Sequence, residues 1–224
     1  MKISVVIPTM NEEESIGQVL DEVKRALSGR DFEMLIIDTK STDKTREIAR
    51  SKGAKVIDEP RRGYGRAYKT GFQAAQGDII ATLDADCTYP ADKIPQMVIM
   101  VEKEGYEFIT TNRLSNISKE AMSTVHRFGN WLLKTTANIL FNIRLKDSQS
   151  GMWVFRKSAL RHLRLTSDGM PLSEEIKIEA MKKGLRCAEV PIELRPRKGE
   201  AKIQSWGDGW KNLKFLFKKR FGMV

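Results

Sequence analysis

The chain has 224 residues, of which 41% are hydrophobic and 30% are charged, a balance typical of one folded globular domain and not of a disordered chain. No apolar run approaches the roughly 18 residues that span a bilayer, and the acidic residues Glu12 to Glu14 come too early for a signal peptide. Two cysteines a hundred residues apart argue against a disulfide framework or a zinc site. We therefore expect a cytoplasmic protein. The net charge is +10, and +7 of it lies between Arg195 and Arg220, which predicts an anionic partner: nucleic acid, a membrane surface or phosphate.

Strands alternate with helices along the first half of the chain. The pattern predicts, in order, a strand at 2–7 that ends at Pro8, a helix at 11–27, a strand at 32–38, a helix that follows TKSTDKT and ends near 52, a strand at 54–58, a helix at 65–76 and a strand at 78–83. This order indicates βαβ units and therefore a parallel sheet with right-handed crossovers. In such sheets, ligands bind beyond the carboxyl ends of the strands.

The second half is less regular. It predicts a strand at 107–111, a helix at 119–142, a break at KDSQSG, a strand at 152–155, a helix at 173–183 and a strand at 186–193. The sequence contains no internal repeat and no low-complexity linker, so we expect one domain.

Polar residues follow three of the predicted strands. Pro8 to Glu12 follow the first strand, Asp38 ends the second, and Asp84 and Asp86 follow the fourth. Two carboxylates that converge at a sheet edge repel each other unless a cation joins them, and carboxylate oxygens suit Mg²⁺ or Mn²⁺. With a nucleoside diphosphate in this crevice, the metal would offset charge on the leaving group, and Asp38 would accept hydrogen bonds from the base.

The loop RRGYGRAYKTG offers a second phosphate-binding element. Gly65 permits close backbone approach, and Arg66 and Lys69 supply positive charge. Each feature also has a structural interpretation: solvated loop acids, Asp38 as a cap of the following helix, and glycines that serve turns and packing. The occurrence of all of them at successive strand ends, in order, favours a functional interpretation.

Five motifs occur in order along the chain: VVIPTMNEEESI, IIDTKSTDKT, RGYGRAYKTGFQAAQGD, LDADCTYP and DSQSGMWVF. Over about residues 2–205 the chain resembles the GT-A glycosyltransferases of family 2, in the branch of dolichyl-phosphate mannose synthase and related polyprenyl-phosphate sugar transferases. The resemblance implies an α/β GT-A fold with a mostly parallel, Rossmann-like central sheet flanked by helices. It implies a catalytic domain over 1–205, with a nucleotide-binding half at about 1–115 and an acceptor-binding half at about 116–205, followed by a basic amphipathic helix over 206–224.

The resemblance also implies ligand sets for this sequence. The divalent metal, Mg or Mn, would be held by Asp84, Asp86 and Thr88. The nucleotide sugar would be held by Pro8, Thr9, Asn11, Glu12, Asp38, Gly65, Arg66, Lys69, Asp84, Asp86 and Lys202. The acceptor phosphate would be held by Arg113, Arg127 and Asn130.

The sequence departs from the family pattern at two of these places. Thr39 stands where the family usually has a second acid, and Thr88 stands where relatives often carry a glutamine. The Gln-x-x-Arg-Trp signature of processive polysaccharide synthases is absent from the sequence, which argues against a chain-polymerising enzyme.

The reaction that the resemblance implies is inverting transfer of a hexose from a nucleotide sugar to dolichyl or polyprenyl phosphate. A phosphate monoester is already an anion at neutral pH, so it needs cations and no dedicated base; the catalytic residues are then Asp86, Arg113 and Arg127. The alternative is a glycan or another lipid acceptor, for which Glu175 is the candidate base. GDP-mannose is favoured as donor, and UDP-glucose and UDP-N-acetylglucosamine stay open.

Two segments are apolar enough to approach a lipid surface. WLLKTTANILFNI covers residues 131–143, and Trp206, Trp210, Leu213 and Phe217 recur at helical spacing among lysines. This pattern suits an interfacial helix on an anionic leaflet. With the chain ending at Val224, we expect peripheral binding at the inner face of the cell membrane, or a partner protein that supplies the anchor. The alternative is a terminal helix packed on its own domain.

Two other classes of protein explain less of the sequence. A nucleic-acid-binding module accounts for the basic terminus but not for the ordered motifs, and no helix-turn-helix, RNP or zinc signature occurs, so we expect no nucleic-acid partner. A Rossmann dehydrogenase shares the sheet topology, but IPTMNEEE stands where its glycine fingerprint would follow the first strand.

Overall fold

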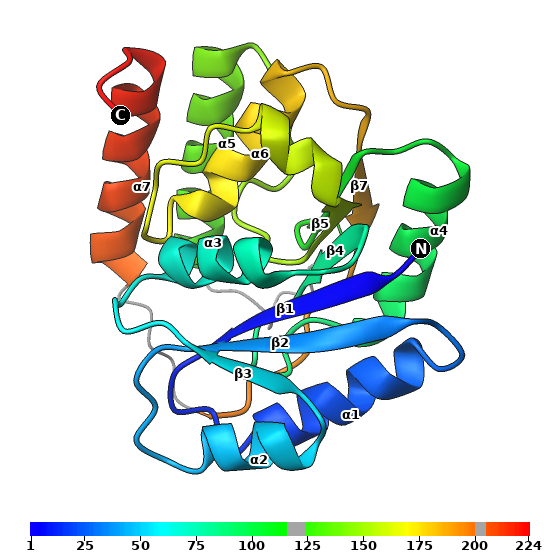
Figure 1. The fold of residues 1–224 in the computed structure, drawn as a ribbon. Helices are drawn as coiled ribbons and strands as arrows, with labels where there is room; N and C mark the ends of the chain where they lie inside the picture. Colours follow the sequence, from blue (N-terminus) through cyan, green and yellow to red (C-terminus); the bar gives the residue numbers. More distant parts are fainter. Residues whose placement is uncertain (116–123, 200–204) are drawn as a thin grey trace.

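The computed structural model of the chain describes residues 1–115, 124–199 and 205–224, with the backbone alone for 124–126, 205 and 206. Within these ranges the chain forms a seven-stranded sheet flanked by helices (Figure 1). The strands are β1 (Ile3–Thr9), β2 (Phe32–Asp38), β3 (Lys55–Asp58), β4 (Ile79–Thr82), β5 (Phe108–Asn112), β6 (Trp153–Arg156) and β7 (Cys187–Pro191). The helices are α1 (Ile16–Ala26), α2 (Thr45–Ser51), α3 (Tyr64–Ala74), α4 (Ile94–Lys103), α5 (Thr124–Phe141), α6 (Leu172–Lys182) and α7 (Ser205–Arg220), with short 3-10 helices at Ala91–Lys93 and Lys157–His162.

The strand order is β3-β2-β1-β4-β6-β5-β7. Neighbouring strands are parallel, except that β6 runs antiparallel to both β4 and β5. The prediction of a mostly parallel sheet flanked by helices is confirmed. In the register, Thr9 lies opposite Asp38, and Asp38 lies opposite Asp58, so the carboxyl ends of β1, β2 and β3 meet at one edge of the sheet.

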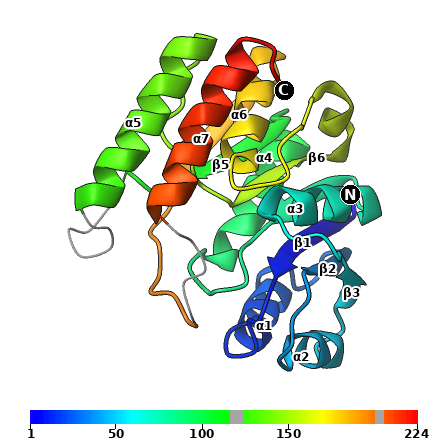
Figure 2. The ribbon, with the colours of Figure 1, turned by 90° about the vertical axis from the view of Figure 1, so that its left-hand side faces the viewer.

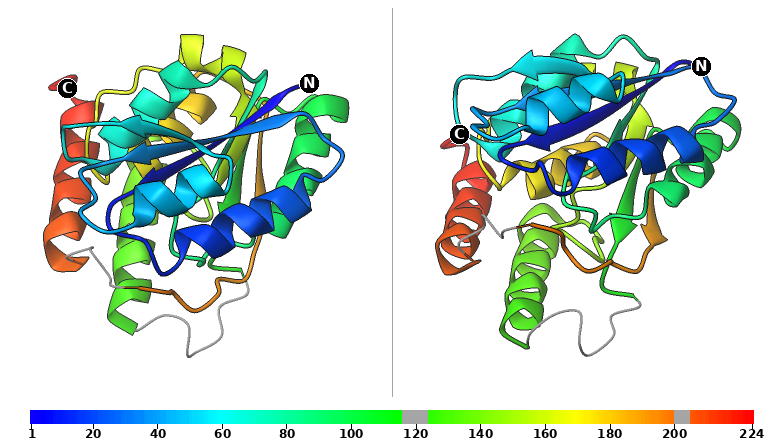
Figure 3. Two further views of the ribbon diagram at one scale, coloured as in Figure 1. Left: turned by 60° about the horizontal axis from the view of Figure 1, so that its bottom comes forward. Right: turned by 90° about the horizontal axis from the view of Figure 1, so that it is seen from below.

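Helices cover both faces of the sheet. Helices α1, α2 and α4 pack on one face, and α3 and α6 pack on the other (Figures 1 and 2). Helices α5 and α7 lie side by side next to α6, where Leu133, Ile178 and Leu216 belong to a third apolar cluster. The views in Figure 3 show the same pair of helices together at one side of the molecule.

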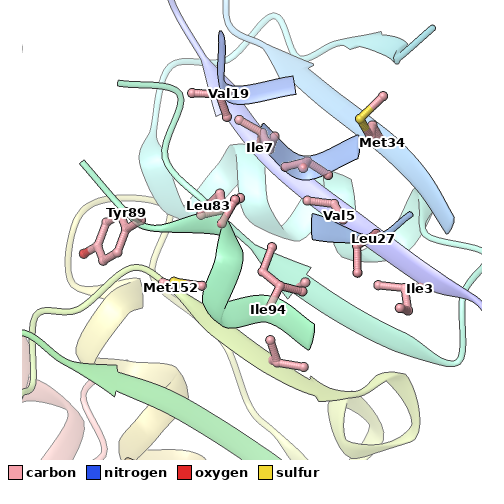
Figure 4. Packing of buried hydrophobic residues seen from close by; sticks show 14 of the residues in the cluster. Ile3, Val5, Ile7, Val19, Leu27, Met34, Leu83, Tyr89, Ile94 and Met152 are labelled. Atoms are coloured by element: carbon pink, nitrogen blue, oxygen red, sulfur yellow. The ribbon is translucent and has the colours of Figure 1, made fainter. Parts of the chain in front are cut away.

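The central strand β1 is buried on both faces, as a parallel strand between two helical layers must be. Ile3, Val5 and Ile7 pack with residues of α1 and α4 in the cluster drawn in Figure 4, whereas Val6 belongs to the cluster on the opposite face. Helix α3 comes very close there, since a Cβ atom on Gly71 would lie 2.3 Å from Val6 Cγ1. This packing holds the end of β1 rigidly beneath the polar residues that follow it.

Strand β1 continues through Pro8 to Thr9, although the sequence pattern ends the strand at 7. The backbone of Val6 faces β4, where its carbonyl accepts from Leu83 N (3.3 Å), and that of Thr9 faces β2, where its carbonyl accepts from Thr39 N (2.8 Å). Pro8 therefore faces the β4 side, where the paired register has already ended at Val6. The missing N–H of Pro8 costs the sheet no hydrogen bond.

Two helices also differ from the pattern. Helix α1 begins at Ile16 and not at 11, because Asn11 adopts a left-handed backbone conformation with φ 52°, which cannot continue a right-handed helix. Helix α4 occupies 94–103, where the pattern assigns no element. Among the helices described, none combines the length and the apolarity that crossing a membrane requires.

Candidate active site

The segments that follow β1 and β2 are joined by hydrogen bonds from backbone N–H groups to side-chain oxygens. Asn11 N donates to Ser41 Oγ (2.8 Å), and Thr42 N donates to Asn11 Oδ1 (2.8 Å). Glu12 N donates to Thr45 Oγ1 (2.8 Å). The residues expected in the first turn of a helix therefore form a loop that is tied to the second strand end.

Asp38 is fully buried at the end of β2. Its Oδ2 accepts from Thr9 Oγ1 (3.1 Å), and its Oδ1 accepts from Ser41 N (3.0 Å) and Arg46 Nε (2.5 Å). Arg46 also reaches Asp58 through Nη2 (3.1 Å). Asp38 thus joins the ends of three strands, and its contact with a nucleobase stays a prediction.

Asp86 lies in the turn that follows β4 and is buried. Its Oδ1 accepts from Thr88 N (3.0 Å) and from Thr88 Oγ1 (2.6 Å). Its Oδ2 lies 3.0 Å from Arg197 Nη1, and Arg197 Nη2 lies 3.7 Å from Glu12 Oε1. One arginine therefore brings the residue that follows the first strand and the acid that follows the fourth strand to the same place.

Asp84 lies in the same turn and is half-buried, with the hydroxyl of Tyr68 3.4 Å from its Oδ1. Burial, and then repulsion from Asp86, raises the pKa of Asp84 to about 7, and the positive charges of Arg113 and Arg197 partly offset that rise. The Asp86 carboxylate is thus close enough to disfavour ionisation of Asp84, as expected where a cation would join two acids.

The glycine-rich loop at the start of α3 packs against the segment that precedes α6. A Cβ atom on Gly65 would lie 2.6 Å from a carbonyl oxygen of that segment, so only glycine fits there. Lys69 Nζ lies 2.5 Å from Asp168 Oδ1, and Arg66 Nε lies 3.3 Å from Glu59 Oε2. Both cations are paired with protein carboxylates, and their binding of phosphate stays a prediction.

Arg113, which follows β5, makes a bidentate ion pair with Asp147. Nε lies 2.7 Å from Oδ2 and Nη2 lies 2.9 Å from Oδ1, and Arg113 N also donates to Oδ2 (3.0 Å). Burial alone would raise the pKa of Asp147, but the charge and hydrogen bonds of Arg113, with help from Lys177, hold that pKa well below its usual range. A buried Arg–carboxylate fork of this kind fixes the guanidinium plane.

The DSQSG segment connects Arg113 to the acids of the β4 turn. Gly151 N donates to Tyr89 Oη (2.8 Å). A Cβ atom on Gly151 would lie 2.4 Å from Tyr64 Oη and 3.4 Å from Asp84 Oδ2, so a side chain here would displace the tyrosine or press on the carboxylate. Because Asp147 begins the same segment, Asp84 and Arg113 are held by one short stretch of chain.

Glu175 is buried in α6, and protein donors occupy both of its oxygens. Oε1 accepts from Thr166 Oγ1 (2.7 Å) and Lys219 Nζ (2.9 Å), and Oε2 accepts from Ser167 N (2.9 Å). These contacts hold the segment before α6 and helix α7, a structural role that the sequence also allows for a glutamate at this place. Its role as a general base stays a prediction.

Glu174, beside it, is also fully buried. Its Oε2 accepts from Gln149 Nε2 (2.9 Å), and its Oε1 is buried with no hydrogen-bond partner in the part of the chain that the structure describes. Burial raises the pKa of Glu174 well above its usual value. Gln149 in turn accepts from Asn212 Nδ2 of α7 (2.8 Å), so a chain of side-chain hydrogen bonds runs from α7 to the DSQSG segment.

The remaining predicted ligands are two residues of α5, one residue of β1 and Lys202. Arg127 is exposed and Asn130 is half-buried on α5. Pro8 lies in β1, one residue before Thr9. Lys202 lies outside the described residues, as does the side chain of Trp206.

The acids of the β4 turn fit a metal ion that is shared with a bound phosphate. Among the described residues, no group of three or more His, Cys, Asp or Glu side chains converges as a complete protein cage. Asp84, Asp86 and the Thr88 hydroxyl supply hard oxygen atoms in one turn. Mg²⁺ is commonly held in this way, by one or two carboxylates with substrate phosphates and water at the other positions.

Several residues of this region were not singled out by the sequence. Asp147 belongs to the DSQSG motif, which did mark the segment, but the motif does not name Arg113 as its partner. Arg197 belongs to the basic segment between Arg195 and Arg220, for which the sequence analysis used only the net charge. Lys177 and Arg46 carried no signal, because a lone cation in a helix is most often a solvated residue.

The sequence of the chain matches that of one known family. A family model described as glycosyl transferase family 2 matches residues 4–164, which is more than half of the chain. The chain therefore belongs to glycosyl transferase family 2, and the predicted enzyme class, a glycosyltransferase, is confirmed.

Two relatives come from Haloferax volcanii. The low-salt glycan biosynthesis hexosyltransferase Agl6 is 38% identical over 218 residues, which cover 96% of this chain and 52% of that protein. A dolichyl-phosphate hexose transferase is 34% identical over 207 residues, which cover 92% of this chain and 89% of that protein. The chain thus spans about half the length of the first relative and most of the second.

A solved structure confirms the fold. Glucosyl-3-phosphoglycerate synthase from Mycobacterium tuberculosis, in complex with Mn²⁺, uridine diphosphate and phosphoglyceric acid, superposes with a TM-score of 0.79 at 21% sequence identity, covering 98% of this chain and 78% of that one. The predicted GT-A fold is therefore confirmed.

Proposed function

We propose that this chain is a metal-dependent, inverting glycosyltransferase that moves a hexose, with mannose favoured, from a nucleotide sugar to dolichyl or polyprenyl phosphate. The observation that carries the proposal is the meeting of charged groups at the β4 turn: Arg197 Nη1 lies 3.0 Å from Asp86 Oδ2, and the positive charge of Arg113 lowers the pKa of Asp84. We infer that an acidic donor side and a cationic acceptor side meet at this turn.

The acceptor chemistry follows from the buried arginine. A lipid phosphate attacks the anomeric carbon with an oxygen that already carries negative charge, so the enzyme must orient that oxygen and needs no proton acceptor. Asp147 engages Nε and Nη2 of Arg113 and so fixes the guanidinium plane before the acceptor arrives. Arg127 and Asn130, on α5, are proposed to hold the same phosphate.

The donor chemistry follows from the acids. Asp84 and Asp86 are proposed to hold Mg²⁺ or Mn²⁺, which when bound would offset the charge of the leaving nucleoside diphosphate. Thr9, Asn11, Glu12 and Asp38 line the ends of β1 and β2 and are proposed to hold the nucleoside. The Mn²⁺ and uridine diphosphate named for the M. tuberculosis synthase and the dolichyl-phosphate acceptor named for one relative support this assignment.

A lipid acceptor also requires access to a membrane surface, and α5 and α7 are proposed to provide it. Apolar side chains on these adjacent helices are exposed, namely Phe128, Trp131, Ile139, Trp210 and Phe217. Lysines interleave with them on α7, in the pattern of a helix that lies on an anionic leaflet. Binding at the inner face of the cell membrane is part of the proposal.

The test is transfer of radiolabel from GDP-mannose, UDP-glucose and UDP-N-acetylglucosamine to dolichyl phosphate in detergent, with Mg²⁺ or Mn²⁺ and with EDTA. We expect an organic-extractable product from one donor that EDTA abolishes. Asp86→Ala should lower the transfer rate by at least about a hundredfold, the range seen when a main electrostatic contact to the transition state is lost. Full activity of Asp86→Ala would refute the metal assignment, and product formed only on a glycan would move the acceptor to the alternative class and bring Glu175 forward as base.

A further inference from the structure

Arg197 sits against the acid that the proposed metal would bind. Its Nη1 lies 3.0 Å from Asp86 Oδ2, and its Nη2 lies 3.7 Å from Glu12 Oε1. The side chain is only 27% exposed, and its Nε is buried with no hydrogen-bond partner among the described residues. The guanidinium is therefore held by the two carboxylates more than by solvent, and one of its donors is unused.

Main-chain hydrogen bonds position Arg197 beside Asp86. Lys198 N donates to Asp86 O (3.0 Å), and Arg195 N donates to Thr88 O (3.0 Å). The segment 195–198 thus runs along the β4 turn, on both sides of the acid that it neutralises. Such anchoring distinguishes Arg197 from a surface arginine that finds a carboxylate by chance, because the backbone loses no further freedom when the pair forms.

We propose that Arg197 is a built-in counter-ion that competes with bare metal ions for Asp86, so that the site accepts the metal together with a nucleoside diphosphate in preference to the metal alone. This inference rests on the proposed metal-dependent function. A guanidinium and a divalent cation on the same carboxylate repel each other, and the negative charge of a diphosphate relieves that repulsion. The resting enzyme then needs no metal to keep Asp86 and Glu12 neutralised.

The experiment measures Mn²⁺ affinity directly, by the electron paramagnetic resonance signal of free Mn²⁺, with and without GDP or UDP. In the absence of nucleotide, Arg197→Gln should bind Mn²⁺ at least about tenfold more tightly than the wild type, the effect of removing one close opposite charge from a carboxylate. Arg197→Lys keeps the charge but loses the fork, and it should give an intermediate affinity. In the presence of nucleotide, the difference between wild type and Arg197→Gln should shrink.

Lys198→Gln is the matched control, since it removes the same charge one residue away. Lys198 Nζ donates to Gln18 Oε1 (2.6 Å) and not to Asp86, and exposed charges are screened within about 8 Å at physiological salt. We expect less than about a twofold change in nucleotide-free Mn²⁺ affinity for this variant.

The outcomes separate this inference from the function on which it rests. Wild-type protein that binds no Mn²⁺ even with nucleotide would overturn both. A second outcome would overturn the counter-ion role alone. In that outcome the wild type binds Mn²⁺ in the presence of nucleotide, but without nucleotide Arg197→Gln and Lys198→Gln bind Mn²⁺ with the same affinity as the wild type. Equal tightening in Arg197→Gln and Lys198→Gln would also overturn it, because general charge would then explain the effect.

Discussion

Arg113 and Asp147 form an ion pair with little solvent around it: the arginine side chain is 13% exposed and the aspartate is fully buried. Removing one member of such a pair leaves an uncompensated buried charge and typically costs about 3–5 kcal/mol. In the intact pair, three hydrogen bonds from Arg113 to this one carboxylate offset the cost of taking both charges out of water. The pair therefore fixes the orientation of the Arg113 guanidinium, whose positive charge acts on Asp84.

Lys177 is the other buried cation of this region. Its Nζ donates to Asp147 O (3.1 Å). Burial, with repulsion from Arg113, lowers its pKa from 10.5 to about 7, although Asp147, Glu189 and Glu174 oppose the shift. At neutral pH the folded protein thus keeps a lysine whose charged form is disfavoured.

This shift predicts a pH dependence of stability. Between about pH 7 and 10.5 the unfolded chain binds a proton at Lys177 that the folded chain has lost, so the free energy of unfolding should rise with pH in that window, by at most about 1.4 kcal/mol per pH unit. The cost of burying the charge is fully present below pH 7. Urea unfolding at a series of pH values should show this rise in the wild type and not in Lys177→Met.

Glu174 could also contribute to the pH dependence of stability, because burial raises its pKa and the charge of Lys177 partly offsets that rise. The same comparison made in a Glu174→Gln background removes its contribution. If the free energy of unfolding rises equally with pH with and without Lys177 in that background, the rise cannot be assigned to Lys177.

At the scale of elements, α7 is joined to the site by buried polar contacts as well as by apolar packing. Asn212 Nδ2 donates to Gln149 Oε1 (2.8 Å), and Gln149 N donates to Asp147 Oδ1 (2.9 Å). Lys219 Nζ pairs with Glu175 (2.9 Å). The terminal helix therefore contacts the segment that holds Arg113.

Asn212→Ala should loosen both partners of this contact. Gln149 would lose a buried hydrogen bond, which costs about 1–3 kcal/mol, so hydrogen–deuterium exchange should rise in α7 and in residues 147–151 together. Lys211→Ala, one residue away and exposed, should leave the exchange of 147–151 unchanged. Faster exchange confined to α7 in Asn212→Ala would show that the helix does not support the segment.

The strands were predictable because their signals are local. The run from Phe32 to Asp38 has the same bounds in the sequence pattern and in the structure, since a β-branched run between turn residues specifies a buried strand. Helix α4 was not predicted from the sequence, because a short apolar run does not distinguish a buried strand from a buried helix. The position of β6 between β4 and β5 also has no local signal, because pairing partners are set by packing of the whole sheet.

At the scale of the whole molecule, exposed aromatic side chains gather on one pair of helices. Trp131 of α5 is 51% exposed and Trp210 of α7 is 63% exposed, and Phe128 stacks on Trp131 with ring centroids 5.8 Å apart. These helices pack side by side, so the molecule presents an apolar surface flanked by lysines.

Trp131→Ala and Trp210→Ala should each weaken binding to vesicles of mixed neutral and anionic phospholipid. Burying one large apolar side chain is worth about 1.5–3 kcal/mol, which predicts a loss of about tenfold or more in the partition coefficient measured by co-sedimentation. Ile99→Ala is the matched control, because Ile99 is also an exposed apolar residue (42%) but lies on α4. Equal binding by all three variants and the wild type would exclude this surface as the docking face.

The sequence alone determined the strands of the sheet, the order of the motifs at their carboxyl ends and the family, because apolar runs, turn residues and motif spacing are properties of neighbouring residues. The tertiary structure decided which of these residues meet. Three contacts join residues from different parts of the fold: the ion pair of Arg113 with Asp147, the ion pair of Arg197 with Asp86 and the hydrogen bond from Asn212 to Gln149. Such contacts depend on the register of the sheet and on how closely the helices pack, and no local pattern encodes either.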